Sequence, residues 1–280
     1  MNAVAVSFVS MLMVSQLCLA SSDTTSPKKL PVPVDKAWKF EQSPVWADEF
    51  DYSGMPDPAK WGYDVGGGGW GNHELQYYTD SGNAIVGNGV LTITARKEDK
   101  ENRHYTSARV ISKGKGDFLY GRFEIRAKLP AGRGTWPAIW MLPTDWAYGG
   151  WPNSGEMDIM EHVGFNPGKV HVSMHTKAYY FKINTQKTSV TEVDSIYDAF
   201  HTYRLDWTPA AIRAYIDGRQ VFEMKNEGQG FEVWPFDKRF HLLLNVAVGG
   251  DWGGKQGVDD RIFPTAMQVD YVRVYKMIDQ

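Results

Sequence analysis

The 280-residue sequence has only one cysteine, Cys18, and it lies within the first twenty positions. Residues 3–14 form an uncharged apolar stretch, and Ala20 ends a small-residue site that precedes the polar run SSDTTSP. This pattern predicts a secretory signal peptide over residues 1–20, although no Lys or Arg precedes the apolar stretch. Cleavage after Ala20 would leave a secreted chain, extracellular or periplasmic, without a thiol. Its stability must then come from a large core and not from disulfide bonds.

A long apolar run and a strong net charge are also missing. The N-terminal apolar stretch is too short and too often interrupted by serine to span a membrane. The formal net charge is -3, which argues against nucleic acid or an anionic membrane as the main partner, and we expect a monomer. Aromatic residues are abundant by contrast, with 11 Trp, 14 Tyr and 13 Phe. Because exposed rings stack on the apolar faces of sugars, this composition favours a carbohydrate ligand.

Composition separates a short leader from one large domain. Residues 21–36 are rich in Ser, Thr and Pro and are predicted to be a leader or linker. Residues 37–280 show no further composition shift, repeat or low-complexity tract, so they are predicted to form a single domain.

The periodicity of this domain is that of β-strands. The segment GRFEIRAKLP alternates, with Phe123, Ile125 and Ala127 on one face and charged residues on the other. Similar short strands are predicted for VLTITA, TYRLDW, HLLLNVAV and VDYVRVYK, and the dipeptides Asn88-Gly89 and Asp217-Gly218 are typical of tight hairpin turns. No segment has a sustained helical apolar stripe, so helix is expected to be minor. Many strands in a domain of this size predict a sandwich or a barrel.

The stretch WPNSGEMDIMEHVGF, residues 151–165, contains three carboxylates within six positions: Glu156, Asp158 and Glu161. Glu156 and Asp158 share one face of a strand, whereas strict alternation places Glu161 on the other face. A β-bulge at Ile159-Met160 would add one residue and return Glu161 to the face of the other two. Because three carboxylates on one face repel each other, such a row indicates a catalytic or a metal site.

The chemistry that fits this row is glycoside hydrolysis with retention. A retaining glycosidase needs a carboxylate nucleophile and a carboxylic acid about 5–5.5 Å apart. Two glutamates that lean toward each other on a concave strand can meet this need, and an aspartate between them can share a proton with the nucleophile. By itself, however, the pattern E-x-D-x-x-E also fits a solvated strand face or a site for a hard cation.

The segments GTWPAIWMLP and WPNSGEMDIMEHVG resemble glycoside hydrolase family 16, in particular the bacterial-type laminarinases, which are endo-β-1,3-glucanases. The resemblance continues through WADEFDYSG, GGGGWGNHELQYYT, NGVLTITARKE, FHTYRLDWTP and LLLNVAVGGDWGG. It implies an all-β, concanavalin-like jelly-roll sandwich of two curved antiparallel sheets, with a sugar groove across one sheet. It also implies that Glu156 is the nucleophile, that Asp158 assists it, that Glu161 is the acid/base, and that the chemistry needs no cofactor.

The resemblance implies six further residues that contact the sugar: Asn72, Arg109, Trp136, Trp140, Trp151 and His175. For Asn72 the alternative is an ordinary glycine loop, and for Arg109 it is a solvated charge. At least one of the three tryptophans is expected to be plain core, because Trp buries well. For His175 the alternative is a structural histidine.

The family resemblance also implies a structural calcium ion near the chain ends. Its ligands would be Glu49 or a neighbour, the carbonyl of Gly89, and Asp270. Asp270 interrupts an apolar strand, where a carboxylate is costly unless something pairs with it. The alternative is a salt bridge between Asp270 and a nearby Arg or Lys.

We therefore expect a secreted endo-β-1,3-glucanase that acts on laminarin-type polysaccharide by a retaining double displacement. Two alternatives stay open. A hydrolase of algal galactans such as agarose or carrageenan shares the bulged motif, and a non-catalytic β-glucan recognition protein shares the fold but usually lacks the acids.

Overall fold

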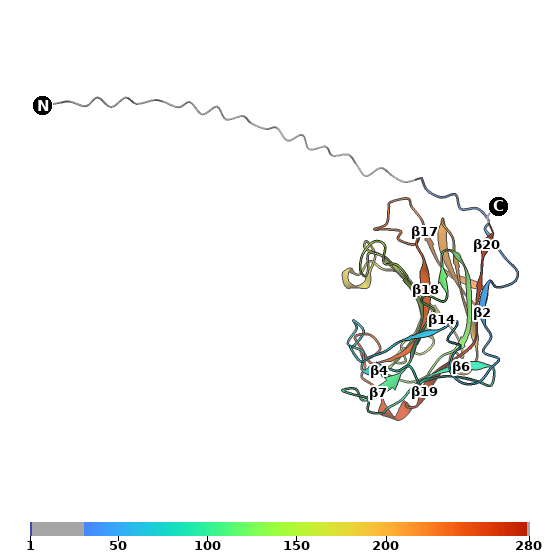
Figure 1. The fold of residues 1–280 in the computed structure, drawn as a ribbon, viewed down its shortest axis with the longest axis vertical. Coiled ribbons are helices and arrows are strands. Elements are labelled where there is room, and N and C mark those ends of the chain that lie inside the picture. The colour runs from blue at the N-terminus through green and yellow to red at the C-terminus, as the bar shows by residue number, and fades with distance from the viewer. Residues whose placement is uncertain (2–30, 279–280) are drawn as a thin grey trace.

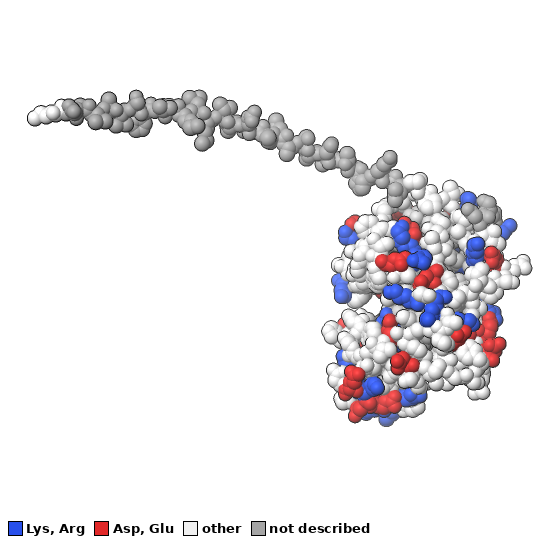
Figure 2. Space-filling model, in the orientation of Figure 1, with Lys and Arg blue, Asp and Glu red and all other residues white. Residues whose placement is uncertain are grey.

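The computed structural model describes Met1 and residues 31–278 (Figure 1). Cys18, most of the predicted signal peptide and most of the predicted leader lie outside the described residues. Within the described part, no helix is long and apolar enough to cross a membrane. Figure 2 shows that acidic and basic side chains are interspersed on the visible face of this part.

Two eight-stranded antiparallel sheets form the body of the molecule. The first, which we call the groove sheet, has the order β14 (Lys187–Glu192), β13 (Lys169–His175), β12 (Glu156–Glu161), β11 (Thr135–Pro143), β18 (Phe240–Val248), β8 (Arg109–Ile111) and β3 (Gly62–Asp64), and β9 (Asp117–Phe118) also pairs with β18. The second, the back sheet, has the order β17 (Arg219–Lys225), β16 (Ala211–Ile216), β15 (His201–Trp207), β10 (Gly121–Lys128), β19 (Thr265–Tyr275), β6 (Val90–Ala95) and β5 (Ala84–Gly87), and β2 (Trp46–Asp48) also pairs with β19.

Four short strands and two helical turns complete the described chain. Strands β1 (Lys39–Phe40) and β20 (Met277–Ile278) pair antiparallel, whereas β4 (Gln76–Tyr78) and β7 (Tyr105–Ser107) pair parallel. The helical turns are the 3-10 helices η1 (Phe181–Ile183) and η2 (Asp260–Ile262). The predicted all-β sandwich with little helix is confirmed.

The core lies between the two sheets. In β10, Phe123, Ile125 and Ala127 are fully buried, as the alternation predicts, while their neighbours are partly exposed. Strand β18 is buried along its whole length. Its even-numbered side chains join the core between the sheets, and on its other face Asn245 and Ala247 form part of the floor of a groove. This double burial explains why HLLLNVAV reads as a continuous apolar run.

Both predicted Asx-Gly turns close hairpins. Asn88 and Gly89 have φ values of 54° and 76° and join β5 to β6. Asp217 and Gly218 have φ values of 48° and 79° and join β16 to β17. Positive φ at both central residues gives the turn a twist that matches the twist of the flanking strands. These residue types adopt that geometry most readily, so the turns were predictable.

The first and last described strands, β1 and β20, lie side by side at one end of the back sheet (Figure 1). On the back sheet, Glu49 accepts two hydrogen bonds from Arg273, of 2.8 and 2.7 Å, and Asp270 pairs with Arg126. The two predicted calcium-binding carboxylates are therefore each engaged by a different arginine, which favours the salt-bridge alternative for Asp270. Calcium binding near Gly89 stays a prediction.

Candidate active site

A β-bulge in β12 places all three acids on the outer face of the groove sheet. On the neighbouring strand β13, Asp158 pairs with Ser173 and Glu161 pairs with His171. The chain advances by three residues from Asp158 to Glu161 on β12 but by only two from Ser173 to His171 on β13. The pairing register therefore shifts between the two acids. The bulge predicted at Ile159-Met160 is confirmed, and it turns Glu161 to the face of the other acids.

The acids lie in a groove with a volume of about 800 Å³. All six residues predicted to contact the sugar line this groove together with the acid row. The expectation that one of the tryptophans is plain core is wrong, because Trp136, Trp140 and Trp151 are all partly exposed in the groove. The reason is that Trp136 and Trp140 stand on the outward-facing positions of β11, and Trp151 lies in the loop before β12.

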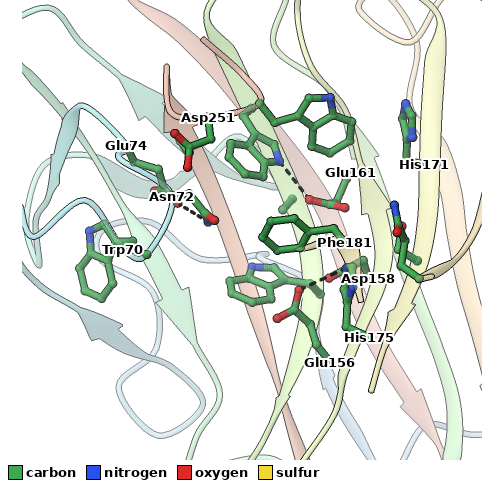
Figure 3. Close-up of a pocket in the computed structure, with 18 of the residues that line it drawn as sticks. Trp70, Asn72, Glu74, Glu156, Asp158, Glu161, His171, His175, Phe181 and Asp251 are labelled. Carbon is green, nitrogen blue, oxygen red and sulfur yellow. Dashed lines mark hydrogen bonds and ion pairs between the residues drawn. The ribbon is translucent and has the colours of Figure 1, made fainter. Parts of the chain in front are cut away.

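Each glutamate of the acid row accepts a hydrogen bond from an indole N–H (Figure 3). Trp151 Nε1 lies 2.7 Å from Glu156 Oε2, and Trp136 Nε1 lies 3.0 Å from Glu161 Oε1. A donor aimed at a carboxylate stabilises its ionised form and fixes its orientation. The two tryptophans therefore hold the two glutamates in place from opposite ends of the row.

His175 lies on β13 beside the Glu156 end of the acid row, because it pairs with Glu156 across the two strands. Its Nε2 is 3.3 Å from Asp158 Oδ2 and 3.9 Å from Glu156 Oε1, and one ligand atom of each of the three residues lies within 4.8 Å of the others. Such a group could in principle hold a cation. However, Glu156 and Asp158 hydrogen-bond to each other and burial raises the pKa of both, so the pair tends to keep a proton that a cation would have to displace. The arrangement fits a shared proton better than a metal ion.

Burial raises the pKa of every acid in the row. It raises the pKa of Glu156 to about 8 and that of Glu161 to about 7, and it raises the pKa of Asp158 well above its usual range. Repulsion adds to burial, from Asp158 on Glu156 and from Glu156 on Glu161. The row therefore carries fewer than three negative charges at neutral pH, so a proton donor and an ionised carboxylate can stand side by side.

Arg109 lines the groove on the far side of β18 from the acids. Its guanidinium lies 5.0 Å from the ring centre of Trp70 and 4.7 Å from that of Trp140, and it forms an ion pair of 2.9 Å with Asp64. Only 8% of Arg109 is exposed, so the alternative of a solvated charge is wrong. An arginine held between two rings is a rigid donor at the groove wall.

Sequence reasoning missed several groove residues, among them Trp70, Glu74, His171, Phe181, Lys182 and Trp252. Glu74 is only 6% exposed, and its carboxylate accepts hydrogen bonds from Gln76 at 2.6 Å and from Asn72 and Tyr78 at 3.3 Å. Burial raises its pKa. Asn72 and Glu74 lie on the opposite side of the groove from the acid row (Figure 3). The acid between amides and aromatics in WGNHELQYYT was the available signal for Glu74.

Comparisons with known proteins agree with this geometry. The sequence profile described as "Glycosyl hydrolases family 16" matches residues 71–273. The chain belongs to this family. The β-glucanase of Rhodothermus marinus is 55% identical over 254 residues, which cover 88% of each chain. The glucan endo-1,3-β-glucosidase A1 of Niallia circulans is 38% identical over 258 residues, which cover 83% of this chain and 37% of that protein.

A solved structure supports the same assignment. The laminarinase from Rhodothermus marinus matches with a TM-score of 0.84 at 53% identity, over 87% of this chain and 100% of that one. The predicted family, the glycoside hydrolase class and the jelly-roll sandwich are thereby confirmed. Family 16 membership leaves the roles of the individual groove residues to be argued from their geometry.

Proposed function

We propose that this family 16 protein is an endo-acting β-1,3-glucanase that hydrolyses laminarin-type β-glucans with retention of configuration. The observation that carries the proposal is the bulged acid row, in which two buried glutamates, each hydrogen-bonded to an indole, face one aromatic groove. Similarity to a laminarinase over most of the chain supports the choice of substrate.

The proposed reaction uses only side chains of the acid row. Glu161 protonates the departing glycosidic oxygen while the Glu156 carboxylate attacks the anomeric carbon, and the sugar becomes covalently bound to Glu156. Glu161 is then a carboxylate and takes a proton from the water that releases the sugar. Asp158 is 2% exposed and lies between the two, so it keeps a proton that it can share with Glu156 before the attack.

Endo action follows from the position of β12 inside the groove sheet. Groove residues come from β11, β18 and β8 on one side of β12 and from β13 and β14 on the other. A polysaccharide that crosses the strands would therefore contact groove residues on both sides of the bond that is cleaved. Such a groove accepts the middle of a long chain, not only its end.

A galactan hydrolase is the second candidate, because the structure brings two lysines to the groove that the sequence did not place there. Lys182 and Lys255 both line it, and the Lys182 ammonium lies 5.4 Å from the ring centre of Trp151. Lysines at these positions could contact sulfate groups. A non-catalytic glucan-binding protein is disfavoured by the complete acid row.

Product analysis with laminarin, curdlan, lichenan, agarose and carrageenan would test the proposal. We expect the fastest reducing-sugar release from laminarin, oligosaccharides of mixed length as early products, and first-formed anomers of β configuration by NMR. Glu156→Gln serves as the inactive control. Faster release from agarose or carrageenan would favour the galactan reading, and no release from any substrate by the folded protein would favour the binding protein.

We further propose that the protein is secreted as a monomer after cleavage behind Ala20. The proposal rests on the signal-like pattern of residues 1–20. Expression of the full chain in a secreting host should give a protein in the medium whose N-terminus is Ser21. Retention of an uncleaved chain in the cells would contradict it, and light scattering after gel filtration would test the oligomeric state.

A further inference from the structure

A second cavity, separate from the groove, has a volume of about 540 Å³. None of the described residues lines both the groove and this cavity. We call it the aromatic cavity, because much of its wall is made of four aromatic side chains: Tyr120, Tyr148, Phe231 and Trp234. Its volume lies within the range of about 300–1,000 Å³ that is usual for sites of small ligands. The proposed reaction uses no residue of this cavity.

One part of the wall is a pair of stacked rings. Tyr148 and Phe231 lie nearly parallel, with an angle of 9° and ring centres 4.7 Å apart. The Tyr148 hydroxyl donates to Asp237, at 2.8 and 2.9 Å from its two carboxylate oxygens, which holds the Tyr148 ring in place. Phe231 remains 38% exposed although Tyr148 covers one of its faces. A supported aromatic ring that stays exposed offers a flat surface for the apolar part of a ligand.

Trp234 brings an unsatisfied hydrogen-bond donor to the same cavity. Its side chain is only 4% exposed, and its Nε1 is buried without a hydrogen-bond partner in the described part of the chain. The neighbouring Trp207 differs, because its Nε1 donates to the carbonyl of Phe236 at 3.0 Å. A buried N–H without an acceptor is costly. Because Trp234 lines the aromatic cavity, a ligand in that cavity can supply the missing acceptor.

The polar groups of the wall indicate the chemical class of this ligand. Asp237 is the only charged residue in the lining, and Tyr148 and Lys238 already engage its carboxylate. A wall of aromatic rings with one acid and no base disfavours an anionic ligand. A neutral sugar fits, because it combines apolar faces for the rings with hydroxyl oxygens that accept from an indole N–H.

The aromatic cavity is continuous with one wall of the groove. The loop between β11 and β12 serves both, since Trp146 and Trp151 line the groove and Tyr148, between them in the sequence, lines the aromatic cavity. Three residues separate Tyr148 from Trp151, so their Cα atoms are at most about 11 Å apart, from about 3.6 Å per residue. A polysaccharide that enters the groove is long enough to reach across this loop. This continuity favours the polysaccharide of the groove as the occupant.

We propose that the aromatic cavity is a second β-glucan-binding site, which holds the polysaccharide beside the groove and takes no part in bond cleavage. Phe231 packs against an apolar sugar face, and a sugar oxygen accepts a hydrogen bond from Trp234 Nε1. The identity of the polysaccharide rests on the proposed function. Because a chain held at two places dissociates more slowly than a chain held at one, the site strengthens binding of the polymer and leaves short oligosaccharides unaffected.

The first test measures binding without cleavage, by sedimentation of the Glu156→Gln variant with insoluble curdlan. Phe231→Ala removes the exposed ring, and Trp234→Phe removes the N–H while it keeps an aromatic ring. Added singly to Glu156→Gln, each should weaken binding to curdlan about 3- to 10-fold, the effect of one lost sugar contact. In the active enzyme, Phe231→Ala should raise KM for laminarin by a similar factor and change kcat/KM for laminaritetraose by less than about twofold.

Two matched variants serve as controls. Ile85→Ala truncates an apolar side chain on β5 that is 40% exposed and lies outside both cavities. Trp38→Phe removes another indole N–H that is buried without a partner, also outside both cavities. Both should bind curdlan as strongly as Glu156→Gln alone. Unchanged melting temperatures would show that all variants are folded.

The outcomes separate this proposal from the proposed function. Unchanged curdlan binding in Phe231→Ala and Trp234→Phe would overturn the proposal and would mean that Pro31 and Pro33, which form part of the wall, close the cavity to ligands. Equal losses on laminarin and on laminaritetraose would mean that Phe231 acts through the groove, which also overturns it, as would a lack of curdlan binding by Glu156→Gln itself. Failure of the proposed function would show instead as a folded wild-type protein that does not cleave laminarin.

Discussion

The paired indole donors give a way to assign the two glutamates without removing either of them. Trp151→Phe deletes the N–H that lies 2.7 Å from Glu156, and Trp136→Phe deletes the one that lies 3.0 Å from Glu161. Each exchange keeps an aromatic ring in the groove. Because the same kind of bond is removed at both glutamates, a difference between the variants reports a difference in role.

The size of the effect follows from the lost bond. A hydrogen bond to a charged group contributes about 1.5–3 kcal/mol, and one pKa unit corresponds to about 1.4 kcal/mol. Each indole donation lowers the pKa of its glutamate, so deletion should raise that pKa by about 1–2 units.

The sign of the consequence differs between the two roles. The pKa of Glu156, about 8, lies above that of Glu161, about 7, so only a fraction of the enzyme has Glu156 ionised and Glu161 protonated at any pH. A higher pKa of Glu156 makes this active fraction smaller, whereas a higher pKa of Glu161 makes it larger. Trp151→Phe should therefore lower kcat/KM at the pH optimum, and Trp136→Phe should raise it.

The assay is kcat/KM for laminarin from acidic to alkaline pH, which reports the ionisations of the free enzyme. Because the three acids are coupled, the limbs of the profile belong to the row as a whole, so the height of the optimum is compared between the variants. A higher optimum in Trp151→Phe, or a lower one in Trp136→Phe, would refute the assignment of roles. The same change in both variants would refute the separate function of the two indoles.

The other predictions concern the acids and the bulge. With an activated aryl glycoside and azide, Glu161→Ala should give a β-glycosyl azide and Glu156→Ala an α-glycosyl azide, as NMR of the products would show; the reverse pattern would exchange the two roles. Deletion of Ile159 should remove the bulge and leave Glu161 four residues after Glu156, so that strict alternation keeps Glu161 on the groove face and part of the laminarin activity is retained; complete loss of activity in a folded variant would show that the bulge itself is needed to position Glu161. The raised pKa of Glu156, about 8 against an unfolded value near 4.3, means that its ionisation opposes folding as pH rises through this window. Glu156→Gln should therefore raise the melting temperature at neutral and alkaline pH and leave it nearly unchanged in strong acid, and a lower melting temperature at alkaline pH would contradict the burial argument.

Several features of the structure were predictable because they depend on neighbouring residues alone. The alternation in β10 shows which of its faces is buried, since successive side chains of a strand point to opposite sides. The positive φ values of Asn88-Gly89 and Asp217-Gly218 follow from the residue types. The bulge at Ile159-Met160 followed from the spacing of the acids, because only an inserted residue can bring Glu161 to the face of Glu156.

Features that depend on how loops and strands meet across the sheet were not predictable from local pattern. The sequence determined that a row of acids would face one side of a strand and that aromatic residues were abundant near it. Only the tertiary structure decided that Trp252 meets His171 beside Glu161, that Glu74 is buried on the opposite side of the groove, and that Arg126 is the partner of Asp270. The physical reason is that the alternation of a strand repeats every two residues, whereas these contacts join segments whose separation is set by the strand order of the closed sandwich.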